Sequence, residues 1–153
     1  YQFNRINNIL HSLSIYGDQN VRWVFQLGSS ETYVAPPEGK YESYDFLNSI
    51  QYNRYAAECS LIIGHCGIGT IYTSLMNGKK TLLIPRLAKY GEFSDDHQLQ
   101  IAGEINTEQF IVYTTVEHID ITTYDLLNFK TYKKRVVYNT LLAGKIHEFI
   151  CDE

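Results

Sequence analysis

Long apolar runs are absent from this 153-residue sequence, and so is any excess of basic side chains. No stretch approaches the roughly eighteen consecutive apolar residues that a membrane-spanning helix requires, so we expect no such helix. Thirteen basic against seventeen acidic side chains give a net charge of −4, which argues against a nucleic-acid partner. No signal-peptide pattern is present either, and we expect a cytoplasmic protein.

Cysteines are few and do not form a metal-binding pattern. Cys59, Cys66 and Cys151 are odd in number, and their spacing fits no zinc motif. A reduced intracellular setting is the simplest interpretation. We expect neither a structural metal nor a bound cofactor.

What the sequence does contain is a regular alternation of short apolar runs and helical periodicities, without a repeat or a linker. A single domain over residues 1–153 is therefore expected. The patterns predict the following elements: a helix over 3–13, strands over 21–27 and 41–46, a helix over 49–59 with Ser49 as candidate N-cap, a strand over 61–63, a helix through residue 75, a strand over 79–85, a helix over 96–105, a strand over 109–115 and a terminal helix over 132–150.

Strands that alternate with helices predict an α/β fold with a doubly wound parallel sheet. In such sheets ligands bind beyond the carboxyl ends of the strands. That rule brings three loops to one edge: the turn at Gly28, the stretch from His65 to Thr70, and the loop that starts at Arg86.

The stretch LIIGHCGIGT, residues 61–70, has two possible roles. Its glycines could form a tight turn that lets a helix pack on the sheet. Alternatively, the backbone N–H groups at the helix start could bind a phosphate group. The dinucleotide fingerprint fails at Tyr72, and no P-loop lysine follows the glycines, so the spacing by itself leaves both roles open.

A second polar cluster lies in PRLAKYGEFSDDHQLQIA, residues 85–102. Asp95 or Asp96 could simply cap the following helix. The combination of Asp96, His97 and Gln98 at a helix start on the same sheet edge also fits a ligand site.

Together, the segments GHCGIGT, GKKTLLIPR and YGEFSDDHQLQIA resemble the donor-binding C-terminal domain of glycosyltransferase family 28. Within that family the similarity is to small single-domain subunits of bacterial exopolysaccharide and capsule synthesis. These are similar in turn to the catalytic subunit of the dolichol-linked UDP-N-acetylglucosamine transferase. The resemblance implies a Rossmann-like domain that forms one half of a GT-B type fold.

The resemblance also implies roles for the residues at matching positions. They are His65 for catalysis at the phosphate or sugar, Gly67, Gly69 and Thr70 for the diphosphate, Asp96, His97 and Gln98 for the hexose, and Gln26 and Gly28 for the nucleotide. Two departures stand out. Thr73 occupies the place of a ribose-binding glutamate. The sequence also starts at the position of the family's first helix, so we expect the first strand of the family domain to be missing, which would leave a slot in the sheet.

The implied activity is that of an inverting UDP-sugar hexosyltransferase acting on a lipid-linked saccharide. Because the chain has no second domain for the acceptor, a membrane-associated partner subunit is expected to carry it and to hold the complex at the inner face of the membrane. The alternative is a non-catalytic module that binds a nucleotide sugar and regulates or scaffolds a partner enzyme.

Overall fold

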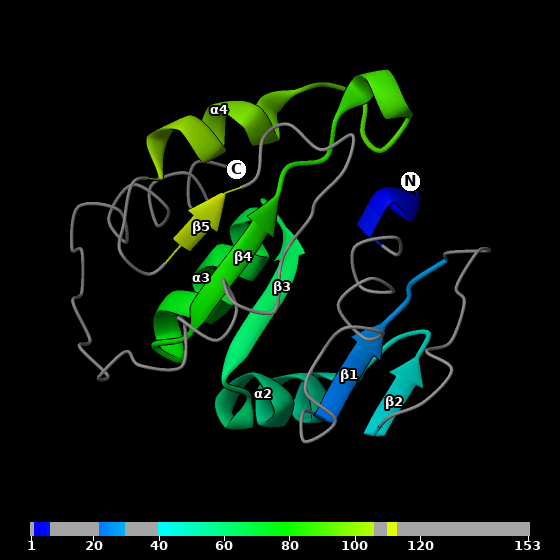
Figure 1. The fold of residues 1–153 in the computed structure, drawn as a ribbon, viewed down its shortest axis with the longest axis vertical. Helices are drawn as coiled ribbons and strands as arrows, with labels where there is room; N and C mark the ends of the chain where they lie inside the picture. Colours follow the sequence, from blue (N-terminus) through cyan, green and yellow to red (C-terminus); the bar gives the residue numbers. More distant parts are fainter. Residues whose placement is uncertain (1, 7–21, 30–39, 106–109, 113–153) are drawn as a thin grey trace.

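The computed structural model describes residues 2–6, 22–29, 40–105 and 110–112. The elements in chain order are β1 (Arg22–Gln26), β2 (Lys40–Tyr44), α2 (Ser49–Glu58), β3 (Leu61–His65), α3 (Ile68–Met76), β4 (Lys80–Ile84), the short 3-10 helix η1 (Ala88–Tyr90), α4 (His97–Glu104) and β5 (Phe110–Val112) (Figure 1). Apart from η1, each of these elements was expected from the sequence. The predicted terminal helix and most of the first helix lie outside the described residues.

All strand pairs in the described residues are parallel, and they form two sheets. One sheet has the order β1-β2, and the other has the order β3-β4-β5. The arrowheads of both sheets point toward the same edge in Figure 1, which we call the carboxyl rim. Parallel strands alternating with helices confirm the α/β class. Among the described residues, β1 and β3 are not paired with each other, so the two sheets are separate.

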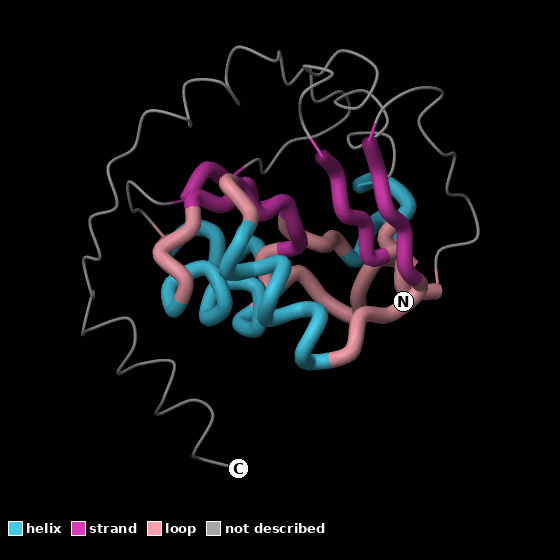
Figure 2. The backbone as a smooth tube through the Cα atoms, turned by 90° about the horizontal axis from the view of Figure 1, so that it is seen from below, coloured by secondary structure: helices cyan, strands magenta, loops and turns pink. Residues whose placement is uncertain are grey.

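Helices lie against the strands, and Figure 2 shows most of the described helical chain on one side of them. Local signals place the helix ends. The N-cap of α2 is Asn48, one residue before the expected Ser49, because its side chain accepts a hydrogen bond from the Gln51 N–H at 2.9 Å. At the C-terminal end of α3, Asn77 is the C-cap and Gly78 has a φ of 58°, as the sequence Asn77-Gly78 predicts.

The hydrophobic core joins α3 and α4 to the larger sheet. Its middle strand, β4, is buried almost completely, with Leu82, Leu83 and Ile84 at most 1% exposed. The core cluster consists of Cys66, Ile71, Leu83, Ala102, Ile105 and Phe110. Because these residues come from the strand ends and from both helices, they fix the loops at the carboxyl rim relative to one another.

The smaller sheet is tied to α2 by a polar cluster around Glu42. Its carboxylate accepts hydrogen bonds from the hydroxyls of Tyr44 and Tyr55, both at 2.8 Å, and pairs with Arg22. These donors, the tyrosines first, lower the pKa of Glu42 to about 2. Among the residues that the structure describes, no helix is long and apolar enough to cross a membrane.

Candidate functional site

The glycine-containing loop begins at His65, the last residue of β3, which lies in register with Ile84 of β4. A tight turn follows, in which the N–H of Gly67 donates to the carbonyl of His65 at 2.9 Å. Helix α3 then starts at Ile68, with Gly67 as N-cap and no side-chain cap hydrogen bond. The first N–H groups of α3 therefore have no side-chain acceptor at the carboxyl rim, where they can bind an anion.

The three glycines of this loop differ in what a side chain at each position would meet. A Cβ on Gly67 would lie 2.2 Å from Cε1 of His65, so Gly67 makes room for the imidazole ring. A Cβ on Gly64 would lie 3.1 Å from Cγ2 of Thr70, so this glycine accommodates a side chain as well. Gly69 is exposed, and a Cβ there would meet nothing within 4 Å. The tight-turn role thus applies to Gly64 and Gly67, and Gly69 borders open space.

Thr70 is held in place by a chain of hydrogen bonds that ends in the sheet. The hydroxyl of Thr81 in β4 donates to the hydroxyl of Ser74 at 2.7 Å, and Ser74 donates to the carbonyl of Thr70 at 2.7 Å. Ser74 and Thr81 are fully buried. The first turn of α3 is thereby anchored to β4, which keeps its N–H groups in a constant position.

His65 is a neutral group at physiological pH. Burial, and secondly the charge of Arg86, lower its pKa to about 4. Its Nδ1 is buried and has no hydrogen-bond partner in the part of the chain that the structure describes. The neighbouring Cys66 is fully buried, and burial raises the pKa of its thiol to about 11, so it is not an activated nucleophile.

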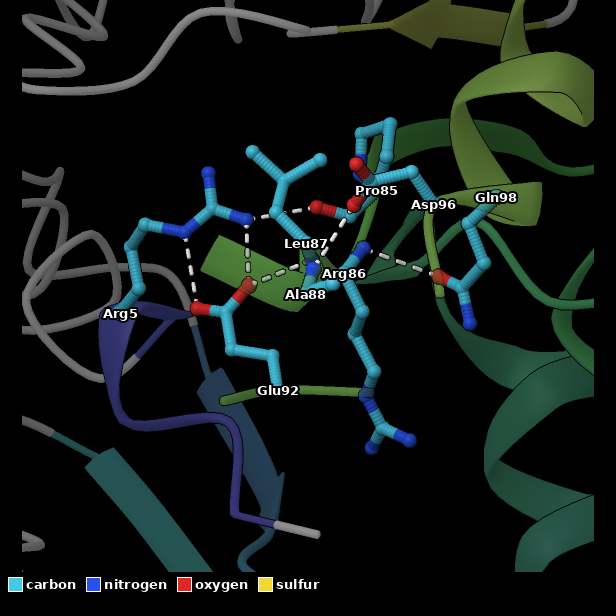
Figure 3. A network of polar contacts seen from close by, with 8 residues as sticks. All are labelled: Arg5, Pro85, Arg86, Leu87, Ala88, Glu92, Asp96 and Gln98. Carbon is cyan, nitrogen blue, oxygen red and sulfur yellow. Dashed lines mark hydrogen bonds and ion pairs between the residues drawn. The ribbon is translucent and has the colours of Figure 1, made fainter. Parts of the chain in front are cut away.

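The loop after β4 is organised by a buried carboxylate, Glu92 (Figure 3). Glu92 accepts hydrogen bonds from Nε and Nη2 of Arg5 at 2.9 and 2.7 Å, and from the backbone N–H of Leu87 at 3.0 Å. Nη2 of Arg5 also donates to the carbonyl of Pro85 at 2.6 Å. The N-terminal segment is thus attached to the carboxyl rim by an ion pair that is almost completely buried.

Gln98, expected to contact the hexose, is 2% exposed and takes part in this network. Its carbonyl oxygen accepts the backbone N–H of Arg86 at 3.0 Å. Because an N–H group must face the oxygen, the amide nitrogen faces away, and in the described residues it has no partner. Gln98 therefore positions the loop, and only its amide nitrogen is left for a ligand.

The other two residues expected at the hexose also make internal contacts. The carboxylate of Asp96 accepts the N–H of Ala88 at 2.7 Å. The ring of His97 contacts the carboxylate of Asp95, which also accepts the His97 N–H at 2.9 Å. Asp96 is the N-cap residue of α4 but makes no side-chain cap hydrogen bond, whereas Asp95 accepts the N–H of His97, the first residue of the helix. These carboxylates hold the loop before α4 in shape.

Gln26 and Gly28, expected beside the nucleotide, lie at the end of β1 in the smaller sheet. The side chain of Gln26 accepts the N–H of Leu47 at 3.2 Å, and the N–H of Gly28 donates to the carbonyl of Asp45 at 2.8 Å. Both contacts are with the loop between β2 and α2. Gln26 and Gly28 lie at the carboxyl rim, as His65 does. Their strand β1 belongs to the smaller sheet and is not paired with β3, which carries His65.

Sequence reasoning placed Arg86 at the ligand edge without giving it a role, and it assigned no role to Arg5 or Glu92, which organise the same loop. Arg86 carried a usable signal, because it is the first cationic residue after a buried strand that ends at the ligand edge. Arg5 carried none, since its partner Glu92 is 87 residues away. In the part of the chain that the structure describes, no group of three metal-ligating side chains occurs.

Comparisons with known proteins identify the family of this chain. Neither the search of curated proteins nor the search of solved structures found a match. The family model described as glycosyltransferase family 28 C-terminal domain matches residues 3–140. Because this match covers nearly the whole sequence, the chain belongs to the glycosyltransferase family 28 C-terminal domain family, whose members bind the sugar donor.

Proposed function

We propose that this chain is the donor-binding, catalytic subunit of an inverting hexosyltransferase that uses a UDP-sugar and a lipid-linked saccharide acceptor. The observation that carries the proposal is the open start of α3 at the carboxyl rim. Gly69 borders free space there, and the N–H groups of the first turn have no side-chain cap. A nucleoside diphosphate offers the charge and oxygen acceptors that such a helix start binds best.

The residues at the start of α3 are suited to stabilise a diphosphate leaving group. In the transfer, the bond between the anomeric carbon and the diphosphate oxygen breaks, and its electron pair remains on that oxygen. The acceptor hydroxyl oxygen bonds to the anomeric carbon from the opposite face and loses its proton to a base. The N–H groups of α3, with the Thr70 hydroxyl beside them, would stabilise the charge that develops on the diphosphate. His65 would act as a neutral hydrogen-bonding group near the phosphate or sugar.

Recognition of the ribose would differ from that in larger family members. At the position of their glutamate, the hydroxyl of Thr73 accepts a hydrogen bond from the Tyr52 hydroxyl at 3.5 Å. A carboxylate that could bind both ribose hydroxyls is therefore missing from that position of α3. The ribose would contribute less to affinity, and the diphosphate correspondingly more.

An acceptor site requires a partner. Sugar transfer needs the acceptor held in line with the donor and water excluded, and the described rim supplies only the donor side. A membrane-associated subunit that carries the lipid-linked acceptor would complete the site and hold this chain at the inner face of the membrane. This organisation is that of the small exopolysaccharide and capsule subunits and of the dolichol-linked enzyme that the sequence resembles.

The internal contacts of Asp96 and Gln98 favour a second candidate function. Since both side chains bind backbone N–H groups of the loop after β4, the chain could bind a nucleotide sugar without catalysing its transfer. In that case it would regulate or scaffold a partner enzyme.

Calorimetry and a transfer assay separate the two candidates. We expect the chain to bind UDP and to distinguish among UDP-sugars, and to release UDP only when co-expressed with an acceptor-binding membrane protein. Substitution of His65 by alanine should lower turnover in that complex while UDP affinity stays within a few-fold. Binding of UDP-sugars without any release of UDP would favour the non-catalytic module. Absence of heat with UDP at millimolar concentration would refute both.

A further inference from the structure

Among the residues that the structure describes, Arg86 forms no ion pair, and the carboxylate of Glu92 acts on it only through its charge. Its backbone N–H donates to Gln98, but no acceptor contacts its guanidinium in the described residues. Its Nε is buried and has no hydrogen-bond partner among the described residues. The nearby carboxylate, Glu92, is already engaged by two nitrogens of Arg5 and by the Leu87 N–H. A half-buried charge without a partner is costly, which suggests that its partner is a ligand.

The guanidinium is nevertheless held in one place. It lies over the buried ring of Phe3, 5.3 Å from the ring centroid. Its backbone is fixed by the buried Gln98 amide on one side and by the Pro85–Arg5 contact on the other. In Figure 3 the Arg86 side chain and the amide nitrogen of Gln98 both extend away from the Arg5–Glu92 pair. The side chain is thus pre-oriented by its surroundings, as a binding group should be.

His65 adds a second group without a partner beside Arg86. It lies in register with Ile84, two residues before Arg86, and its buried Nδ1 has no partner within the described ranges. The charge of Arg86 contributes to the lowered pKa of His65, so the two side chains are close enough to interact electrostatically. Arg86 and the Gln98 amide nitrogen offer only donors, and neutral His65 can offer one. Donors without a carboxylate among them are suited to an oxyanion.

We propose that Arg86 is an anion-binding residue of the donor site, whose guanidinium pairs with the phosphate oxygens of a nucleoside diphosphate. The proposal rests on the proposed function and adds to it the cation that the helix start of α3 lacks. Arginine presents parallel N–H groups that match two phosphate oxygens, which a lysine does not reproduce. With the weak ribose contact at Thr73, this ion pair would supply a large share of the affinity.

Calorimetry of the full chain with UDP, inorganic pyrophosphate and uridine tests the proposal. We expect Arg86→Gln to weaken UDP and pyrophosphate roughly tenfold to a hundredfold, as loss of a charged hydrogen bond does, and to leave uridine within about twofold. Arg86→Lys should be intermediate. Arg54→Gln is the matched control, because Arg54 also lies over a ring, 4.8 Å from the centroid of Tyr55, but is exposed on α2. It should bind as the wild type does.

The outcomes distinguish this proposal from the proposed function. If the wild type binds UDP and Arg86→Gln binds it equally well, only the role of Arg86 is overturned. Equal losses for UDP and uridine, without recovery in Arg86→Lys, would also overturn it, because they indicate a structural role. Binding of pyrophosphate that depends on Arg86, without any binding of UDP, would support the anion site and refute the UDP function. No binding of any probe would refute both.

A second measurement uses only the wild-type protein, so it does not depend on the folding of a variant. Nuclear magnetic resonance of the labelled histidines gives the pKa of His65 in the wild type. Pyrophosphate should raise that pKa, because an anion bound to Arg86 offsets the charge that lowers it. An unchanged His65 pKa at saturating pyrophosphate would contradict the proposal.

Discussion

Replacing the buried Glu92 by alanine should lower the free energy of unfolding more than replacing an exposed charged residue does. The carboxylate is 3% exposed and accepts three hydrogen bonds, two from Arg5 and one from the Leu87 N–H. Its removal leaves the Arg5 side chain, 12% exposed, with an unpaired charge. Breaking a buried pair in this way costs about 3–5 kcal/mol, out of a total stability of about 5–15 kcal/mol.

Urea denaturation followed by circular dichroism measures this loss. With a slope of about 2 kcal/mol/M, the midpoint should fall by roughly 2 M. The double variant Arg5→Met/Glu92→Leu should recover much of the loss, because it leaves no unpaired charge. Arg22→Met, which removes an ion pair with an arginine side chain that is 55% exposed, is the control and should shift the midpoint far less. A Glu92→Ala midpoint within about 0.5 M of the wild type would refute the reasoning, as would a double variant no more stable than the single one.

Three further predictions concern pH, ligand space and helix capping. The pKa of His65 is lowered from 6.5 to about 4 on folding, so the unfolded chain takes up a proton first and stability should fall as the pH drops from 6.5 toward 4. His65→Asn should remove up to about 3 kcal/mol of that decline in pH-dependent denaturation, and an identical pH profile would contradict the assignment. Gly69→Val should fold normally, because a Cβ there meets nothing within 4 Å, yet lose UDP binding in calorimetry; unchanged affinity would place the phosphate elsewhere. Asn48→Ala should lower the free energy of unfolding by about 1 kcal/mol through loss of the capping box, and a Ser49→Ala variant of equal cost would contradict Asn48 as the cap.

Much of the fold could be read from local patterns. Short apolar runs and helical periodicities are set by neighbouring residues, so the strands and helices were placed within a few residues of their observed bounds. The end of α3 at Asn77 was likewise predictable, since Gly78 readily adopts the positive φ that the turn requires. The N-cap of α2 was misplaced by one residue because Asn48 and Ser49 are both good caps, and only the observed bond with Gln51 selects between them.

The sequence by itself determined the α/β class and the resemblance to family 28, because both depend on patterns of residues close together in the chain. The general rule for parallel sheets then placed three loops at one edge. Only the tertiary structure decided which side chains contact one another at that edge. Gln98 turned out to bind the Arg86 backbone, and Arg5 to pair with Glu92 across 87 residues. Such contacts depend on which loops the strand order brings together in space, and no local pattern encodes that distance. For the same reason, the unpaired charge of Arg86 became visible only once the partner of Glu92 was known.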